Sequence, residues 1–285
     1  MGALWMLVAG FLFACMGVFV KLGAPYFSNI ELVFYRSFIG LLLVFFIMRA
    51  QRIPLATRHF RNHLWRGLSG TIALTLFFYC ITRLPLATAI TLNYTAPMFL
   101  TLLTMLIYKD KFHLPLSFAI LTGFCGVVLL LHPTLAREQL LTGLAGLTSG
   151  FLAGVAYLNV KQLGILGEPD TRTVLYFSLI ASVCSGVWLL FDQFHAVTWQ
   201  SSLLLLGLAA TATLAQIAMT RAYRVGRTQV VSSLAYSTIV FASLFGIALW
   251  KETLPPSSWL GMAFIIASGV LSLSLSPKHP SPKES

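Results

Sequence analysis

Polar side chains interrupt residues 90–111, a stretch otherwise apolar enough to lie in a lipid bilayer. Asn93, Tyr94 and Pro97 bring an amide, a phenol and a helix breaker into it. A polar group in hydrocarbon is costly unless it finds a hydrogen-bond partner. An amide and a phenol offer hydrogen bonds to a polar ligand, so the chemistry that this segment suggests is binding rather than bond breaking.

Four expected helices share this pattern. At about 100° per residue, their polar side chains fall on one face of each helix. They are Asn93, Tyr94, Pro97 and Thr101 at 86–107, Ser232, Ser233, Tyr236 and Ser243 at 228–250, Thr71, Thr75, Tyr79 and Thr82 at 66–83, and Thr213, Gln216 and Thr220 at 201–220. Because lipid cannot satisfy these groups, we expect the four faces to meet each other or water.

Two interpretations of these faces stay open. A Ser or Thr hydroxyl can bond its own helix backbone or join two helices, and for these residues the structural role is favoured. Asn93, Gln216 and the three tyrosines need partners outside their own helix, which favours a substrate cavity. Pro97 frees a backbone carbonyl near Asn93, which serves as a ligand acceptor or as a bending point.

One charged side chain falls inside an expected span. Arg36 lies about two turns into residues 30–48, where it would neutralise a substrate carboxylate or pair with Glu31 near the outer end. The sequence favours neither role. Lys21 and Lys161 end their apolar runs, and we interpret them as anchors that reach the membrane interface.

The sequence contains no pattern for catalysis or metal binding. All six histidines fall in expected loops, at span ends or in the tail, and there is no H-E-x-x-H, Walker A or Gly-rich nucleotide loop. The four cysteines lie in apolar runs without a C-x-x-C pair, as is typical of packing residues. We expect no enzyme activity, no cofactor and no metal site. Since no Asp or Glu falls at mid-membrane, no carboxylate proton carrier is evident either.

The composition points to a membrane protein. The chain has 285 residues, of which 58% are hydrophobic and 9% charged, and its eight acids and nineteen bases cannot cover the surface of a soluble domain of this length. The formal net charge of +11 would also suit a nucleic-acid partner. Basic residues in membrane proteins instead follow the topology rule, so we expect no nucleic acid.

Ten apolar runs are long enough to cross a bilayer core of about 30 Å as helices. They lie at residues 3–21, 30–48, 66–83, 86–107, 114–132, 142–161, 173–191, 201–220, 228–250 and 257–275. With both termini in the cytoplasm, fourteen of the nineteen bases lie inside and four outside, which predicts this orientation. Gly146, Gly150 and Gly154 give the sixth run a smooth face for close packing.

The second half of the chain repeats the first. The matched stretches, at shifts of 140 to 142 residues, are 79–111 with 221–253, 10–21 with 150–161, and 35–39 with 176–180. Tyr94 then matches Tyr236. Because five spans per copy is an odd number, the second copy must enter the membrane from the opposite side. The sequence thus predicts two inverted repeats of five helices, at 1–138 and 139–276, and a cytoplasmic tail at 277–285.

The closing segments of the two halves resemble those of the drug/metabolite transporter superfamily, in its EamA branch. They read LPLATAITLNYTAPMFLTLLTMLIYKDK and GRTQVVSSLAYSTIVFASLFGIALWKET. Each runs from small residues through a helix to an acidic residue. The first has Asp110 where the family more often has Glu, and the second has Ile239 in the place of Pro97. The likeness covers nearly the whole chain, and it implies a substrate cavity between the halves.

These observations predict an all-α, ten-helix secondary transporter of the inner membrane, with N- and C-termini in the cytoplasm, that works by alternating access. The resemblance implies export of small metabolites, with amino acids or related zwitterions favoured. A metallophore, a vitamin or a nucleotide-derived metabolite stays open, as does a non-transporting scaffold or sensor. The expected partners are a small-molecule substrate and the lipid bilayer. H⁺ as coupling ion, and a monomer or a homodimer, stay open. The expected substrate-binding residues are Arg36, Thr75, Tyr79, Asn93, Tyr94, Pro97, Gln216, Ser232, Ser233 and Tyr236.

Overall fold

The computed structural model is helical and describes residues 2–108, 118, 121–123, 125–126, 129, 137–192, 194–225 and 234–275, in which no strand occurs. The helices are α1 (Gly2–Gly23), α2 (Asn29–Ala50), α3 (Phe60–Arg83), α4 (Leu86–Asn93), α5 (Ala96–Tyr108), α7 (Arg137–Ile165), α8 (Asp170–Leu189), α9 (Trp199–Val225), α11 (Ser237–Trp250) and α12 (Pro256–Leu275). Most of the span expected at 114–132, and residues 228–233 of the ninth span, lie outside the described residues.

Length and composition make this a multi-pass membrane protein. Within the described residues, six helices are long and apolar enough to cross a bilayer: α1, α2, α3, α7, α8 and α9. Two shorter apolar helices lie at Ser237–Trp250 and Pro256–Ser268. The boundaries differ most at α3, which begins at Phe60, six residues before the start that the apolar pattern predicts.

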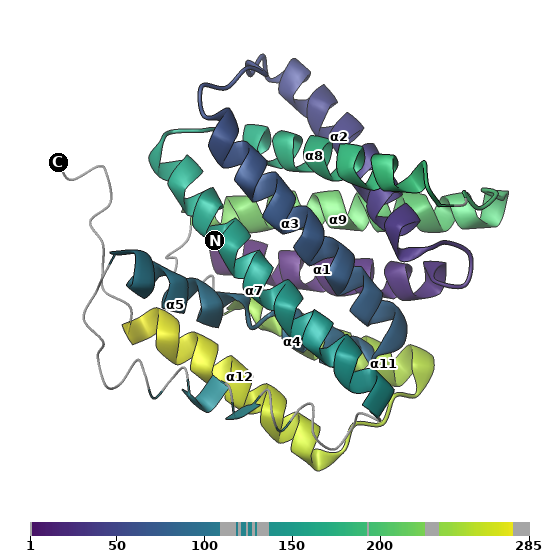
Figure 1. Ribbon diagram of the computed structural model, residues 1–285, viewed down its shortest axis with the longest axis vertical. Coiled ribbons are helices and arrows are strands. Elements are labelled where there is room, and N and C mark those ends of the chain that lie inside the picture. Colours follow the sequence, from purple (N-terminus) through teal and green to yellow (C-terminus); the bar gives the residue numbers. More distant parts are fainter. Residues whose placement is uncertain are drawn as a thin grey trace.

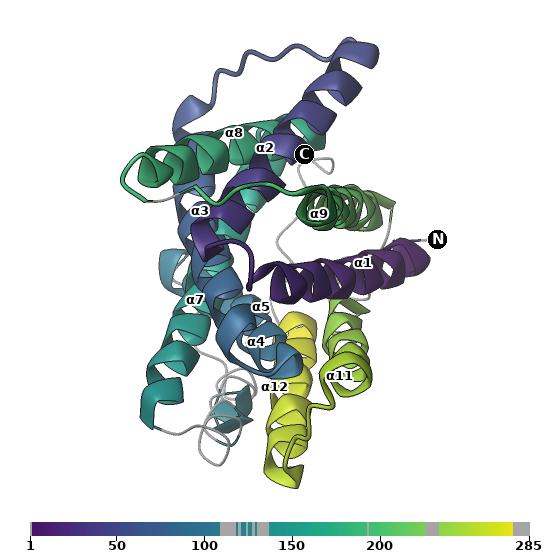
Figure 2. The same cartoon turned by 90° about the vertical axis from the view of Figure 1, so that its right-hand side faces the viewer.

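The helices pack in pairs that correspond between the two halves. α1 packs along α9, and α3 packs along α7 (Figure 1). In the sequence alignment of the halves, α1 corresponds to α7 and α3 corresponds to α9. The α1–α9 contact and the α7–α3 contact are therefore equivalent. α2 packs on α8, its own counterpart. Figure 2 shows α1 between α9 and α11, and the corresponding helix α7 contacts α3, α4 and α5.

The fourth expected span is interrupted. We predicted one continuous helix at 86–107, but α4 ends at Asn93 and α5 begins at Ala96, with a turn at Tyr94 and Thr95. Pro97 has no N–H to bond the carbonyl of Asn93. The hydroxyl of Thr95 donates to the carbonyl oxygen of Leu92 at 2.6 Å, which replaces a backbone donor there. Both features favour a break at this point.

A second interruption occurs at the corresponding place in the other half. Leu234 and Ala235 are helical, Tyr236 forms a turn, and α11 begins at the next residue. The hydroxyl of Thr238 donates to the carbonyl oxygen of Ala235 at 2.9 Å. The second half has Ile239 at the position of Pro97, so proline is not required for the interruption. A side-chain hydroxyl bonded to the backbone accompanies both.

A glycine lies against each interruption. A Cβ atom on Gly10 of α1 would lie 2.7 Å from Oγ of Ser237, and one on Gly150 of α7 would lie 2.6 Å from the carbonyl oxygen of Leu92 and also meet Thr95. Both approaches are too close for a carbon atom. Gly10 matches Gly150 in the sequence alignment, so the first helix of each half packs its glycine on the interruption of the other half.

Lys21, at the end of α1, has a protein partner. It forms an ion pair with Glu252, which follows α11. The other carboxylate oxygen of Glu252 accepts from the backbone N–H of Leu86 at 2.9 Å. We expected Lys21 to act as an interfacial anchor; it instead joins the ends of α1 and α11 to the start of α4.

Candidate substrate cavity

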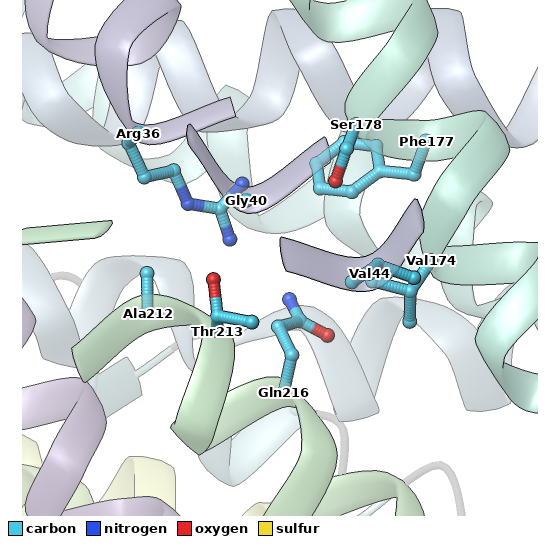
Figure 3. A pocket seen from close by; sticks show the side chains of 9 residues that line it. All are labelled: Arg36, Gly40, Val44, Val174, Phe177, Ser178, Ala212, Thr213 and Gln216. Carbon is cyan, nitrogen blue, oxygen red and sulfur yellow. The ribbon is translucent and has the colours of Figure 1, made fainter. Parts of the chain in front are cut away.

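A cavity of about 100 Å³ lies where helices of both halves meet. Its polar lining comes from α2, α3, α7, α9, α11, the end of α4 and the interruption that follows it. These side chains are Arg36, Arg66, Asn93, Tyr94, Tyr157, Gln216 and Thr238. A small recess between α2, α8 and α9 adjoins the cavity and shares Arg36, Phe177 and Gln216 with it (Figure 3). Figure 3 shows Arg36 pointing from α2 into this recess, toward Thr213 and Gln216.

Arg36 is buried and is not paired with Glu31. Its side chain is on the cavity-facing side of α2, and the residue is 6% exposed. The carboxylate of Glu31 accepts from the backbone N–H of Ser28 at 2.7 Å, and its other oxygen accepts from that of His195 at 2.7 Å. No ion pair joins Arg36 to Glu31, although the structure describes both. Of the two roles that the sequence left open, pairing with Glu31 is therefore absent.

Arg66 is a second buried arginine in the cavity. The expected span at 66–83 begins with this residue, but α3 begins six residues earlier, so Arg66 lies in its second turn and is 8% exposed. A Cβ atom on Gly70, one turn later, would meet the guanidinium of Arg66 and lie 3.1 Å from the ring of Phe177. The glycine thus leaves room for this side chain to lie along its own helix.

Both arginines lie against one phenyl ring. The central carbon of the guanidinium is 4.2 Å from the ring centroid of Phe177 for Arg66 and 5.4 Å for Arg36. Phe177 occupies the position in the second half that matches Arg36, as the alignment of 35–39 with 176–180 shows. The α2–α8 contact therefore places Arg36 beside Phe177, and these two residues occupy equivalent positions in the two halves.

The charge of the two arginines is not balanced nearby. Among the cavity-lining residues that the structure describes, none is acidic. No ion pair in the described part of the chain includes either arginine, and neither Nε atom has a hydrogen-bond partner there. A cation–π contact contributes roughly 0.5–2 kcal/mol, whereas burying an ion costs several. The arrangement favours an anion in the cavity.

Asn93 and Tyr94 have both structural and cavity contacts. Nδ2 of Asn93 donates to Oγ of Ser149 at 2.7 Å, and that hydroxyl donates to the carbonyl oxygen of Ala73 at 2.8 Å, so the amide joins α4 to α7 and α3. The phenol of Tyr94 bonds Oγ1 of Thr238 at 2.9 Å, which joins the two halves across the cavity.

The structure brings together four of the residues that the sequence indicated: Arg36, Asn93, Tyr94 and Gln216. Three others do not line the cavity. Tyr79 lies under the guanidinium of Arg83 at 4.5 Å, the hydroxyl of Thr75 donates to the carbonyl oxygen of its own helix at 2.9 Å, and Tyr236 is buried with its ring 6.2 Å from that of Tyr94.

The remaining expected residues have less described geometry. Pro97 lies in the first turn of α5, and Ser232 and Ser233 lie outside the described residues. Arg66, Phe177 and Tyr157 also line the cavity and were not among the expected substrate-binding residues. For Arg66, the sequence held one indication: Gly70 follows it by one helical turn, which leaves room for the arginine side chain along the helix.

Comparisons with known proteins agree on one family. The model of the EamA-like transporter family matches residues 1–132 and 140–274. An uncharacterized transporter of Helicobacter pylori is 29% identical over 279 residues, covering 95% of this chain and 93% of that protein. The pseudopaline exporter CntI of Pseudomonas aeruginosa is 28% identical over 271 residues, covering 95% and 92%. A riboflavin transporter of Vibrio cholerae is 29% identical over 274 residues, covering 94% and 91%.

A solved crystal structure shares the fold. It aligns over 98% of this chain and 99% of its own, with a TM-score of 0.69 and 17% identity.

Proposed function

The chain belongs to the EamA-like transporter family, and from that premise we propose that it is a secondary transporter that exports small metabolites by alternating access. The observation that carries the proposal is the cavity between the two halves, with two buried cations and several amide and phenol groups in its lining. Charged groups buried inside a membrane are rare and typically mark substrate or ion pathways.

The pairing of the helices supports alternating access. Each half packs its first helix on the third helix and on the interrupted fourth span of the other half. Two matched halves around one site are what a transporter needs to expose that site to each side in turn. We propose ten spans in two inverted repeats, residues 1–138 and 139–276, in the inner membrane with both termini in the cytoplasm, as the distribution of basic residues favours.

Amino acids or related zwitterions are the substrate class that the sequence favours. The names of the relatives broaden the choice, since one is a pseudopaline exporter and another a riboflavin transporter. We therefore keep a metallophore or a vitamin as the second candidate. Family scaffolds of this kind change substrate by changing cavity residues, so the fold does not decide between them.

Metabolite profiling of cells with and without the gene tests the proposal. We expect a small metabolite to accumulate inside the cells that lack the gene and to reappear in the medium when the gene is restored. Gln216→Ala should reduce its secretion about tenfold, because it removes an amide from the cavity while the helix backbone is unchanged. Thr75→Val is the matched control, since Thr75 bonds its own helix outside the cavity. Unchanged profiles under all growth conditions would favour a scaffold or sensor.

The coupling ion requires a separate measurement. Flux into inverted vesicles should respond to an imposed proton gradient if export is coupled to H⁺. A flux that ignores the gradient would identify a facilitator instead.

A further inference from the structure

The two buried arginines narrow the class of ligand, on the premise that the cavity is the transport site. We propose that the cavity binds an organic dianion with two separated carboxylates, one at Arg36 and one at Arg66. Both side chains are more than nine-tenths buried, both line the cavity, and both leave Nε without a protein partner. The sequence had favoured amino acids and zwitterions in general, without a second arginine in view.

The argument for an anion is electrostatic. Two guanidinium groups lie close enough to share the ring of Phe177, in a region from which water is largely excluded. Like charges repel there, and each has lost most of its hydration. Because the cavity lining that the structure describes offers no carboxylate, a bound anion is what balances them. The planar fork of arginine also fits a carboxylate through two parallel hydrogen bonds.

The argument for two separated acidic groups is geometric. The two guanidinium groups lie near one ring but face different parts of the site: Arg36 points into the recess toward Thr213 and Gln216, whereas Arg66 lines the main cavity and not the recess. One carboxylate carries a single negative charge, so even when it bridges both arginines it leaves one of the two positive charges unbalanced. A ligand whose two carboxylates lie on different carbons reaches both arginines. Its apolar part then lies against the ring of Phe177.

The remaining polar groups fit the neutral parts of such a ligand. Gln216, Thr213 and Tyr157 offer amide and hydroxyl groups around the arginines. A ligand ammonium has no carboxylate partner among the described lining residues. The site therefore discriminates against a simple zwitterion with one acid and one amine, in favour of a ligand that carries net negative charge.

Binding to the purified full-length protein tests the inference. The probes are malonate, succinate, glutarate and adipate as dicarboxylates, butyrate as the monocarboxylate and alanine as the zwitterion, at one ionic strength set with chloride. Ligand-dependent thermal stabilisation in detergent gives the apparent Kd of each. We expect at least one dicarboxylate to bind tenfold or more tightly than butyrate and alanine. Equal affinity for butyrate and the best dicarboxylate, or no binding of any dicarboxylate, would overturn the proposal.

Variants assign the effect to the two arginines. Arg36→Gln and Arg66→Gln should each weaken dicarboxylate binding at least tenfold and bring it close to the affinity for butyrate. Arg36→Lys and Arg66→Lys keep the charge and should retain part of the affinity, which guards against variants that fail to fold. Arg83→Gln is the matched control, because Arg83 also lies over an aromatic ring but outside the cavity. Unchanged dicarboxylate binding in both glutamine variants would refute the assignment.

The binding assay is independent of the export assay. Secretion of a metabolite that depends on the gene, together with no dicarboxylate binding, would refute the inference and leave the proposed function intact. Dicarboxylate binding that depends on both arginines, with no effect of the gene on any metabolite, would refute export and leave the ligand class intact.

Discussion

Among the described residues, partly buried basic side chains lie at helix ends, and buried ones lie in the central cavity. At the helix ends they are paired. Lys21 forms an ion pair with Glu252, and their side chains are 16% and 11% exposed. Arg172 donates to Glu168 at 2.8 Å at the start of α8. In the cavity, Arg36 and Arg66 have no acidic partner among the described residues.

This difference separates charges that contribute to the stability of the fold from charges that reduce it. A buried ion pair that loses one partner leaves a costly charge behind, so the pairs at the helix ends must be kept intact for stability. A buried cation without a partner already carries that cost in the folded protein. Stability alone therefore does not account for such a cation in the cavity.

The largest expected effect comes from removing Lys21. Lys21→Met leaves the carboxylate of Glu252 buried without its cation, and we expect the free energy of unfolding to fall by about 3–5 kcal/mol. Arg36→Met should leave the free energy of unfolding unchanged or raise it, because the guanidinium of Arg36 has no ion-pair partner that the substitution would leave unpaired. Denaturant unfolding in detergent micelles measures both. If Lys21→Met and Arg36→Met had the same effect, the comparison between the two regions would be wrong.

A double variant sharpens this test. Lys21→Met combined with Glu252→Gln removes both charges, so it should recover part of the stability lost by Lys21→Met alone. Additive losses in the double variant would show that the two residues act independently.

The next largest effect on stability is expected from packing rather than charge, where α7 contacts the interruption between α4 and α5. Gly150→Ala places a methyl group against Thr95 and the carbonyl of Leu92, and we expect a loss of about 1–3 kcal/mol in the free energy of unfolding. Gly164→Ala is the matched control in the same helix, since nothing lies within 4 Å of a Cβ atom there. It should raise stability by roughly 0.5–1 kcal/mol, because alanine is the better helix former. Equal effects of the two changes would contradict close packing at the interruption.

A smaller effect, dependent on pH, is expected at Glu168, in the connection between α7 and α8. Burial by itself raises the pKa of this carboxyl, but hydrogen bonds from Thr57 and Arg172 and the nearby charges of Arg172 and His63 outweigh it, so the pKa lies below 4.5. A lowered pKa stabilises the fold above the unfolded pKa, and this contribution is lost as the pH falls through the folded pKa.

Arg172→Met tests this expectation. The variant should be less stable than the parent protein by about 1 kcal/mol at pH 7, since it removes the charged hydrogen bond to Glu168. The difference should persist down to about pH 5 and shrink as Glu168 is protonated at lower pH; the part that remains comes from the hydrogen bond that Arg172 also donates to the carbonyl oxygen of Pro54. Thermal unfolding between pH 3 and pH 7 measures it, and a difference that stays constant over this range would exclude the linkage.

The smallest expected effect is at the polar contact between the two halves. Tyr94→Phe removes the hydroxyl that bonds Thr238, and we expect a loss of about 0.5–1.5 kcal/mol. Thr238→Val removes the other partner. A double-mutant cycle of these two changes should give a coupling energy of similar size, whereas a coupling near zero would show that the contact contributes nothing to stability.

Hydrophobic pattern and charge were sufficient to predict much of the fold. The apolar runs predicted an all-helical membrane protein, which the described residues confirm. The resemblance of the closing segments predicted the EamA family, which the family match confirms. The limits of the two repeats and their inverted orientation stay predictions. The interruption at Tyr94 and Thr95 was not predicted as such, because hydropathy does not record which side chain bonds the backbone.

The cavity was predictable only in part. Arg36, Asn93 and Gln216 were visible as polar residues within apolar runs. Arg66 was not, because it stands where the apolar run begins and the topology rule counts such a residue as part of a loop. Its burial depends on an earlier start of α3 and on the space that Gly70 leaves beside it. Contacts of that kind depend on how different helices pack against each other. The hydropathy pattern of one segment carries no information about that packing.

The interruption between α4 and α5 has a mechanical consequence. Bending an unbroken helix at its middle stretches several backbone hydrogen bonds at once. At this joint Pro97 supplies no N–H, and the carbonyl of Leu92 is bonded by the hydroxyl of Thr95, which belongs to the turn itself. Fewer bonds resist a tilt of α5 relative to α4. Tilting α5 about this joint therefore costs less than bending a continuous helix at the same place.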